Sequence, residues 1–212
     1  MVLMNTLKEI TNFMDLNLNN KLIVAFLLLS VVAFGQKRDR VEFKVDNLYQ
    51  GIYSEVLEQP LEVTYTVKCP NGTASRSGMD FKTVVGLYTS DNDDYSNNIW
   101  DKGHLAPAAA FSCNLETLKK TFLYSNSALM HEGLNRGQWN QLESFERDLA
   151  NFYDVHVTIK VLFEGNVERL PSGATVPSGF IKVLQFGEKT VTFKFPNADT
   201  KGTNWIDYKI PN

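Results

Sequence analysis

The chain has 212 residues and a formal net charge of −3 at pH 7, and its length suits one domain with a substantial buried core. The slight acidic excess excludes nucleic-acid binding driven by overall charge, so a site for a polyanion would have to be a local basic patch. Two cysteines are too few for a disulfide scaffold or a zinc site, and the three histidines show no metal-ligand spacing.

The first feature along the chain is an apolar run at residues 22–34. It is too short for a membrane span, which needs about 20 residues, but it suits the apolar segment of a secretory signal peptide, which takes about 7–15. Lys21 precedes the run, and the small residues Ala33 and Gly35 lie at its end. We therefore expect residues 1–35 to be a cleaved signal peptide and the protein to be secreted or periplasmic, without membrane contact after cleavage. The alternative is a buried helix.

Residues 36–212 are expected to form one domain in which strands flank a single helix. Alternating and β-branched stretches at 41–45 and 61–67 predict strands. The helix is expected at 134–153, where apolar residues recur at steps of three and four. Its apolar face consists of Trp139, Leu142, Phe145, Leu149 and Phe152. The other expected strands are 122–125, 155–163, 179–186 and 189–195. This order of elements indicates an α+β domain with a mainly antiparallel sheet.

Residues 73–98 are rich in Ser, Gly, Asp and Asn and predict a long surface loop, a kind of segment that often carries function. The acidic stretch Asp91–Asp94 lacks the twelve-residue calcium-loop pattern, which favours a solvated turn. Cys69 and Cys113 could pair in an oxidising compartment, but the sequence gives no distance between them and leaves the pairing open.

His104 is the first residue that suggests chemistry. Phosphodiester hydrolysis needs a base for the attacking water, a cation for the developing negative charge, and donors that position the phosphate. An imidazole with a pKa near 6.5 can be neutral and accept a proton, and the rate should then fall as His104 protonates at acid pH. For an isolated histidine, packing or capping a turn would be the better interpretation, so the case depends on the neighbouring residues.

Asn135 is expected at the start of the helix, where its amide oxygen could bind a hard cation and the helix N-terminus would favour a phosphate. One such ligand suffices for magnesium, which often keeps most of its waters. The alternative role is an N-cap. Glu143 would lie about 12 Å along an α-helix from Asn135 and about 80° around it, so it is expected to hold a metal-bound water rather than the ion. The alternative for Glu143 is an ion pair with Arg147.

Three segments together carry a resemblance. The chain reads Asp-Lys-Gly-His at Asp101–His104, Ser-Asn at Ser125–Asn126, and Leu-Asn-Arg-Gly-Gln-Trp-Asn-Gln-Leu-Glu at Leu134–Glu143. It resembles the DNA/RNA non-specific endonucleases, the ββα-metal nucleases that include endonuclease G, whose pattern is Asp-Arg-Gly-His, Ser-Asn and Leu-Asn-x-x-x-Trp-x-x-Leu-Glu. The resemblance is strong over residues 100–150. It implies a ββα-metal core with a mainly antiparallel sheet and one principal amphipathic helix.

The resemblance also implies roles for single residues. His104 would be the general base, Asn135 the metal ligand and Glu143 the holder of a metal-bound water. The implied cofactor is Mg²⁺, with Mn²⁺ or another divalent cation as alternatives. The implied substrates are DNA and RNA, cut without strong sequence specificity.

Four further residues are implied near the phosphate. Asn126 would support the phosphate site and Arg147 would contact phosphate. Arg76 is the candidate for an upstream arginine of the family, although a solvated surface arginine is an equal alternative. Lys102 stands where the family has arginine, and it keeps the charge while losing the planar pair of donors, so slower turnover is expected.

These residues predict a metal-dependent endonuclease. One alternative is a catalytically weak or inactive relative that binds nucleic acid or a protein partner, and another is an extracellular structural module. Joint retention of His104, Asn135 and Glu143 favours the enzyme, because a binding module needs neither a base nor a hydrated cation. The sequence contains no helix-turn-helix or zinc finger, so base-specific recognition is not expected. The oligomeric state is left unknown.

Overall fold

The computed structural model describes residues 36–211 of the chain. The expected signal peptide and its cleavage site lie outside this range. From Arg38 to the end of the described range, the chain forms one compact unit. Among the described residues, no helix is both long and apolar enough to cross a membrane.

The main sheet within residues 36–211 has seven strands in the order β1-β2-β3-β6-β7-β8-β9, and each neighbouring pair is antiparallel. Two further strands, β4 and β5, form a separate antiparallel ribbon. The expected α+β fold with a mainly antiparallel sheet is confirmed. The strands are β1 (Val41–Val45), β2 (Tyr49–Ser54), β3 (Gln59–Thr66), β4 (Trp100–His104), β5 (Ser127–His131), β6 (His156–Leu162), β7 (Gly179–Phe186), β8 (Lys189–Pro196) and β9 (Lys209–Ile210).

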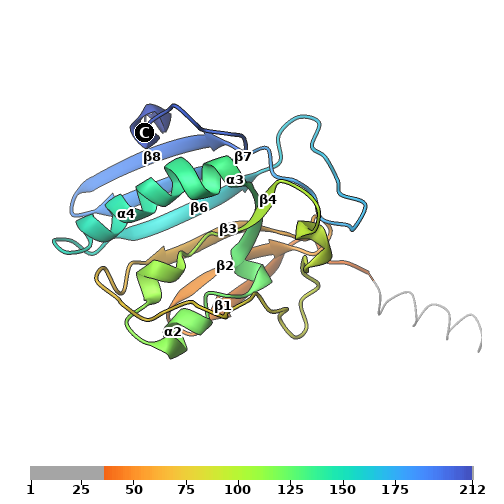
Figure 1. The fold of residues 1–212 in the computed structure, drawn as a ribbon, viewed down its shortest axis with the longest axis horizontal. Coiled ribbons are helices and arrows are strands. Elements are labelled where there is room, and N and C mark those ends of the chain that lie inside the picture. Colours follow the sequence, from red (N-terminus) through yellow and green to blue (C-terminus); the bar gives the residue numbers. More distant parts are fainter. Residues whose placement is uncertain (1–35, 212) are drawn as a thin grey trace, which may run out of the picture. The chain divides into compact units, whose positions relative to one another are not determined.

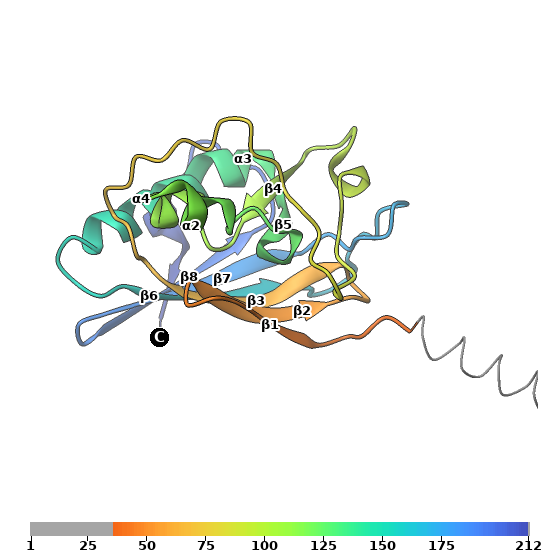
Figure 2. The same cartoon turned by 90° about the horizontal axis from the view of Figure 1, so that it is seen from below.

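The ribbon and the helices all cover one face of the main sheet (Figures 1 and 2). Successive side chains of a strand point to opposite faces, and on β6 the buried residues Val157, Ile159 and Val161 alternate with more exposed ones. Trp139 of the main helix packs onto this covered face, with its ring centroid 5.4 Å from that of Phe180 on β7. This packing anchors the helix that carries several of the candidate site residues.

The main helix consists of three joined parts: α3 (Glu132–Leu134), a π-helical segment η4 (Asn135–Trp139) and α4 (Asn140–Leu149). Gly137 departs from helical geometry inside the π segment, with φ −100° and ψ −114°. The helix therefore begins before the expected residue 134, and Asn135 follows its first turn instead of starting it. The N-cap role considered for Asn135 belongs to His131, whose side chain accepts a hydrogen bond from the backbone of Gly133.

The main helix ends at Leu149, before the expected residue 153. The side-chain amide of Asn151 donates to the backbone oxygens of Arg147 and Asp148, which satisfies carbonyls of the last turn and ends the helix. Phe152 is consequently 80% exposed, and its expected place on the apolar face is wrong.

The region before the main helix also differs from expectation. Instead of a strand at 122–125, Leu123 forms an isolated bridge with Lys82, and a turn closed by a hydrogen bond from the Asn126 backbone to Leu123 leads into β5 at Ser127. The long polar loop is confirmed, apart from one short helix. The short helices of the described chain are η1 (Asp93–Tyr95), η2 (Ala108–Phe111), α2 (Leu115–Lys119), η3 (Tyr124–Asn126) and η5 (Trp205–Tyr208).

The acidic stretch of that loop is not a solvated turn throughout. Asp94 is only 2% exposed, and its carboxylate accepts hydrogen bonds from the backbone of Asp91 and of Ala174. The expectation is therefore wrong for Asp94, which ties the loop to a distant part of the chain.

The two cysteines form a disulfide, which answers the question that the sequence left open. Cys69 and Cys113 are joined, with their Cα atoms 5.6 Å apart. The backbone of Cys69 also donates to Ala110, and that of Ala74 donates to Ser112. The start of the long loop is thus held to the segment that follows η2.

Candidate active site

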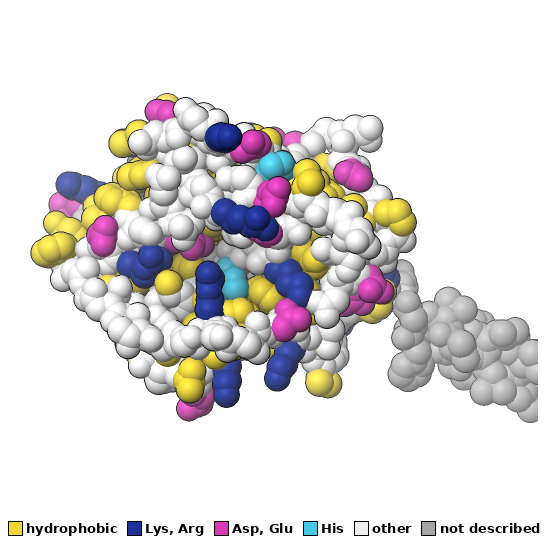
Figure 3. Space-filling view, in the orientation of Figure 1, with side chains coloured by type: hydrophobic (Ala, Val, Ile, Leu, Met, Phe, Trp, Pro, Cys, Tyr) yellow, Lys and Arg dark blue, Asp and Glu magenta, His cyan; other side chains and the backbone are white. Residues whose placement is uncertain are grey.

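A cavity of about 950 Å³ lies between the long loop, strand β4 and the main helix (Figure 3). Figure 3 shows basic side chains gathered around this hollow. Four basic residues and one carboxylate line it, which supplies the local basic patch that an acidic chain needs to bind a polyanion. These residues are Arg76, Lys102, Arg136, Arg147 and Glu143.

His104, the last residue of β4, lines the cavity. Its ring lies between two aromatic side chains, with centroids 4.6 Å from Phe81 and 4.8 Å from Phe122. Burial, and secondly the positive charge of Arg76, lowers its pKa to about 3. The imidazole is therefore neutral well below pH 6.5, and Nε2 is buried without a hydrogen-bond partner among the described residues. Such a nitrogen can accept a proton, and the lowered pKa shifts the expected loss of activity through His104 protonation to a pH below 6.5.

The backbone around His104 is held by Asn126. The Asn126 side chain is fully buried, accepts a hydrogen bond from the backbone of Ala106, and donates to the backbone oxygens of Ala106 and Thr121. The backbone oxygen of Asn126 accepts from Leu105. These contacts use both ends of the Asn126 amide. Asn126 therefore holds the turn that follows the histidine, and its expected direct place in the phosphate site is wrong.

Asn135 lines the cavity from the π segment. Its side-chain nitrogen donates to Asp101 at 2.9 Å, so the amide is fixed with its nitrogen toward β4. Arg136 binds the same carboxylate through two nitrogens, at 2.9 and 2.6 Å. Asp101 therefore orients Asn135 and leaves the amide oxygen as the atom suited to a cation.

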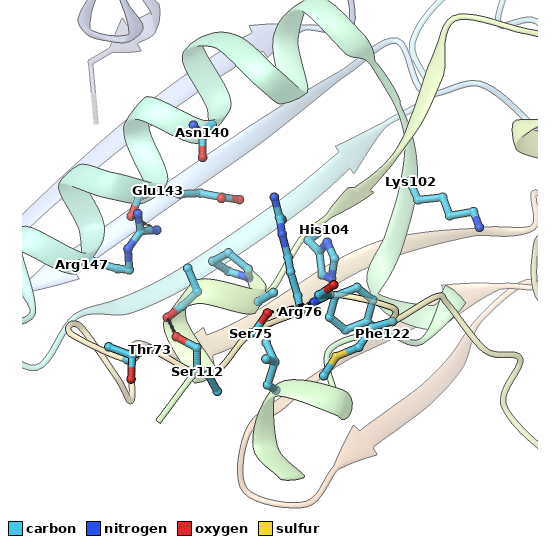
Figure 4. A pocket seen from close by; sticks show the side chains of 18 of the residues that line it. Thr73, Ser75, Arg76, Lys102, His104, Ser112, Phe122, Asn140, Glu143 and Arg147 are labelled. Carbon is cyan, nitrogen blue, oxygen red and sulfur yellow. Dashed lines mark hydrogen bonds between the residues drawn. The ribbon is translucent and has the colours of Figure 1, made fainter. Parts of the chain in front are cut away.

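The helix is interrupted between Asn135 and Glu143. In a straight α-helix the two would be about 80° apart, but Gly137 lies between them with non-helical φ and ψ, so the spacing of a regular helix does not apply. Asn135, Asn140 and Glu143 accordingly all line the cavity, and Figure 4 shows Asn140 and Glu143 on its helical wall. The two candidates therefore share one site, and the expected assignment of the ion to Asn135 and of a metal-bound water to Glu143 stays a prediction.

Glu143 is a partly buried carboxyl whose pKa is raised to about 7. Burial is the largest cause and the charge of Glu146 adds to it, while Lys182 and Arg147 act in the opposite direction. Within the described chain, Arg147 donates to the backbone oxygen of Glu143 and to Ser144 rather than to the Glu143 carboxylate. The alternative role of Glu143, a surface ion pair between its carboxylate and Arg147, is therefore wrong.

Arg76 and Lys102 lie on different sides of His104 in the close view of the cavity (Figure 4). Arg76 is exposed on the long loop and lies beside His104. Lys102 points away from His104, and its ammonium bonds Asp80 at 2.6 Å and Asn92 at 2.5 Å. The expected phosphate contact by Lys102 is thus not present, because its charge is already paired.

Three residues contribute to this site without having been predicted from the sequence. Asp101 opens the recognised motif, and its place in that motif is the signal that could have identified it. Arg136 adjoins Asn135 in sequence, but its pairing with Asp101 depends on the fold. Phe81 lies far from the motif in sequence and has no local signal, although its ring covers His104.

The donor set fits a hydrated hard cation better than a fully coordinated transition metal. Within the part of the chain that the structure describes, no group of three or more His, Cys, Asp or Glu side chains could hold a metal ion. Asn135 and His104 nevertheless line one cavity, and Mg²⁺ accepts one or two protein ligands while keeping its waters.

Comparison with known proteins relates this cavity to nucleases. Residues 30–212 match the family model described as DNA/RNA non-specific endonuclease. Nuclease EXOG, mitochondrial, of Xenopus laevis is 34% identical over 143 residues, or 66% of this chain and 36% of the relative. Endonuclease G, mitochondrial, of Bos taurus is 35% identical over 124 residues, or 57% of this chain and 40% of the relative. A nuclease of Syncephalastrum racemosum is 44% identical over 94 residues, or 43% of this chain and 28% of the relative. The chain spans well under half the length of these relatives.

A solved structure supports the fold. The crystal structure of the EndoG/EndoGI complex aligns with TM-score 0.68 and 24% identity over 79% of each chain. The expected secreted or periplasmic location is contradicted, because the relatives from Xenopus laevis and Bos taurus are named as mitochondrial nucleases. The fold agrees with the ββα-metal nuclease architecture, and the family match covers most of the sequence. The chain therefore belongs to the DNA/RNA non-specific endonuclease family.

Proposed function

We propose that the cavity hydrolyses phosphodiester bonds in DNA and RNA with the help of a divalent cation, most simply Mg²⁺, and with little preference for base sequence. The observation that carries this proposal is that His104, Asn135 and Glu143 line one cavity and that Nε2 of His104 has no partner among the described residues. A base without a competing hydrogen bond can take a proton from water without first losing another contact.

The proposed reaction assigns one task to each side chain. A water oxygen bonds to phosphorus while its proton passes to Nε2 of His104, and the bond from phosphorus to the leaving sugar oxygen breaks as that oxygen takes up a proton from solvent. Arg147 of α4 and Arg76 of the long loop both line the cavity and bind the phosphate oxygens.

The polar residues of the helix complete the arrangement. Asn135 would hold the cation through its amide oxygen, and Glu143 would orient a water on that cation. A bound divalent cation supplies stabilisation of the negative charge that grows on the phosphate. Asp101 keeps the Asn135 amide in the required orientation through its 2.9 Å hydrogen bond.

The test is cleavage of supercoiled plasmid and of unstructured RNA by the purified full chain. Activity should require a divalent cation, stop in excess chelator, and return when Mg²⁺ is added beyond the chelator. Binding of nucleic acid without cleavage under all of these conditions would instead identify an inactive relative. Full activity in excess chelator would contradict the metal-dependent mechanism.

A further inference from the structure

We infer that Lys102 is a positioning residue: its ion pair with Asp80 holds the loop segment that covers His104, and its ammonium does not contact the substrate. This inference rests on the proposed function of the same cavity. It gives the lysine of the Asp-Lys-Gly-His motif a task different from binding phosphate.

The surroundings of the Lys102 ammonium leave it little capacity for a further partner. It bonds the carboxylate of Asp80 at 2.6 Å and the amide oxygen of Asn92 at 2.5 Å. The ring centroids of Tyr124 and Phe81 lie 5.5 and 5.8 Å from it, within the range of cation–π attraction. The Lys102 side chain is only 21% exposed, so a phosphate would have to displace contacts that are already formed.

The partner carboxylate is connected directly to the cover of the histidine. The same Asp80 oxygen that binds Lys102 also accepts a hydrogen bond from the backbone of Phe81 at 2.8 Å. The Phe81 ring then packs on His104 at 4.6 Å and on Phe122 at 5.3 Å. Fixing Asp80 therefore fixes the position of the ring that buries the candidate base.

Strand geometry explains why a lysine at this position can do this. Lys102 and His104 are two residues apart on β4, so their side chains leave the same face of the strand. Phe81 contacts both of them, the ammonium through its ring at 5.8 Å and the imidazole at 4.6 Å. The same loop carries Arg76, so a displaced loop would alter both the burial of the base and the position of a proposed phosphate donor.

Asp80→Asn distinguishes the two possible roles of Lys102, positioning the loop and binding phosphate, because they predict opposite results. Asp80 is 63% exposed and is not among the proposed catalytic or binding residues, so the variant should fold. If Lys102 positions the loop, loss of the Asp80 charge lowers kcat. If Lys102 binds phosphate, the same change releases the ammonium and should tighten binding of DNA and raise kcat/KM.

The experiment compares Asp80→Asn, Lys102→Met and the double variant with Glu164→Gln as the matched control. Glu164 forms an exposed ion pair with Lys194 and does not line the cavity. With Mg²⁺ and a duplex oligonucleotide, we expect both single variants to lower kcat by about 10-fold with KM nearly unchanged, as for a small misplacement of reacting groups. The double variant should be no slower than the slower single variant, because the two changes remove one interaction.

Binding in chelator provides the second measurement. Lys102→Met should leave the salt dependence of DNA binding unchanged, whereas loss of a true phosphate contact would reduce the slope of log K against log salt by about 0.9. A reduced slope, or an Asp80→Asn enzyme with unchanged or increased kcat/KM, would overturn the positioning role.

Amide hydrogen exchange in the metal-free protein measures the loop without requiring activity. Exchange at Phe81 and Lys82 should be faster in Asp80→Asn and in Lys102→Met than in the wild type, and unchanged in Glu164→Gln. Equal protection in all four proteins would refute the positioning role even if the wild type cleaves DNA. An inactive wild type that shows the expected exchange pattern would instead refute the proposed function alone.

Discussion

The side-chain nitrogen of Asn135 donates to the carboxylate of Asp101 at 2.9 Å, and Arg136 holds the same carboxylate through two nitrogens. One residue of β4 thus determines which atom of Asn135 faces the cavity. A carboxylate that orients a metal ligand without touching the ion is a common arrangement in metal sites.

The first prediction concerns this orienting contact. Asp101→Ala should weaken the apparent affinity for Mg²⁺ by about 10–100-fold, because the Asn135 amide is then free to rotate. The measurement is the Mg²⁺ concentration that gives half-maximal cleavage. Glu132→Gln is the matched control, since the Glu132 carboxylate also pairs with Arg136, at 3.0 Å, while Glu132 meets Asn135 only through a backbone hydrogen bond that the substitution keeps. An equal loss in both variants would mean that the position of Arg136 matters, rather than the orientation of Asn135.

Glu143 gives the second prediction. Glu143→Gln should lower kcat by about 10–100-fold, because a neutral amide orients and polarises a cation-bound water less well. Asp148→Asn, an exposed change in the same helix, should leave kcat unaltered. The folded state raises the Glu143 pKa from 4.5 to about 7, so the wild-type protein loses folding stability as the pH rises through that window. The Gln variant should therefore be at least as stable as the wild type at pH 8. Lower stability with normal turnover would contradict the assigned role.

The third prediction follows from the lowered pKa of His104. Its pKa falls from 6.5 to about 3 in the folded state, so between these values the unfolded chain binds the extra proton. The stability that the neutral histidine retains above pH 6.5 is therefore lost progressively as pH falls toward 3. Urea unfolding should show a smaller loss of stability over this range for His104→Gln than for the wild type. Parallel curves would show that the imidazole is not held neutral.

The disulfide gives the fourth prediction. Joint replacement of Cys69 and Cys113 by serine should reduce the free energy of unfolding by about 2–4 kcal/mol, because it removes a covalent link between segments 44 residues apart. Chemical denaturation measures this loss. The link also holds the start of the cavity loop, so KM should rise more than kcat falls. An unchanged unfolding midpoint in the double variant would show that the disulfide adds no stability.

The sequence predicted best those strands whose alternation is undisturbed. The strand predicted at 179–186 has the same bounds as β7, and the strand predicted at 189–195 agrees with β8 within one residue. Both strands lie in the main sheet, where one face is buried and the period of two is retained. The ribbon strands β4 and β5 were missed because β4 carries site residues such as Lys102 and His104 in place of an alternating apolar pattern.

The candidate site was predictable as a set of residues but not as a geometry. The motif identified His104, Asn135 and Glu143, but the interruption of the helix at Gly137, between Asn135 and Glu143, has no signal in the apolar period of the sequence. The burial of Asn126 was equally hidden, because a buried amide bound to backbone and an exposed amide near a phosphate have the same local sequence. Contacts formed across the fold determined both.

The central claim is that His104 is the general base, and His104→Ala tests it most directly. Single-turnover cleavage of a duplex oligonucleotide with saturating Mg²⁺ should be about 10²–10⁴-fold slower than in the wild type, the usual contribution of a positioned base. DNA affinity measured in chelator should change little, because Arg147 and Arg76 remain. A His104→Ala protein that cleaves at the wild-type rate would contradict the mechanism, and one that loses DNA binding together with cleavage would make His104 a binding residue instead.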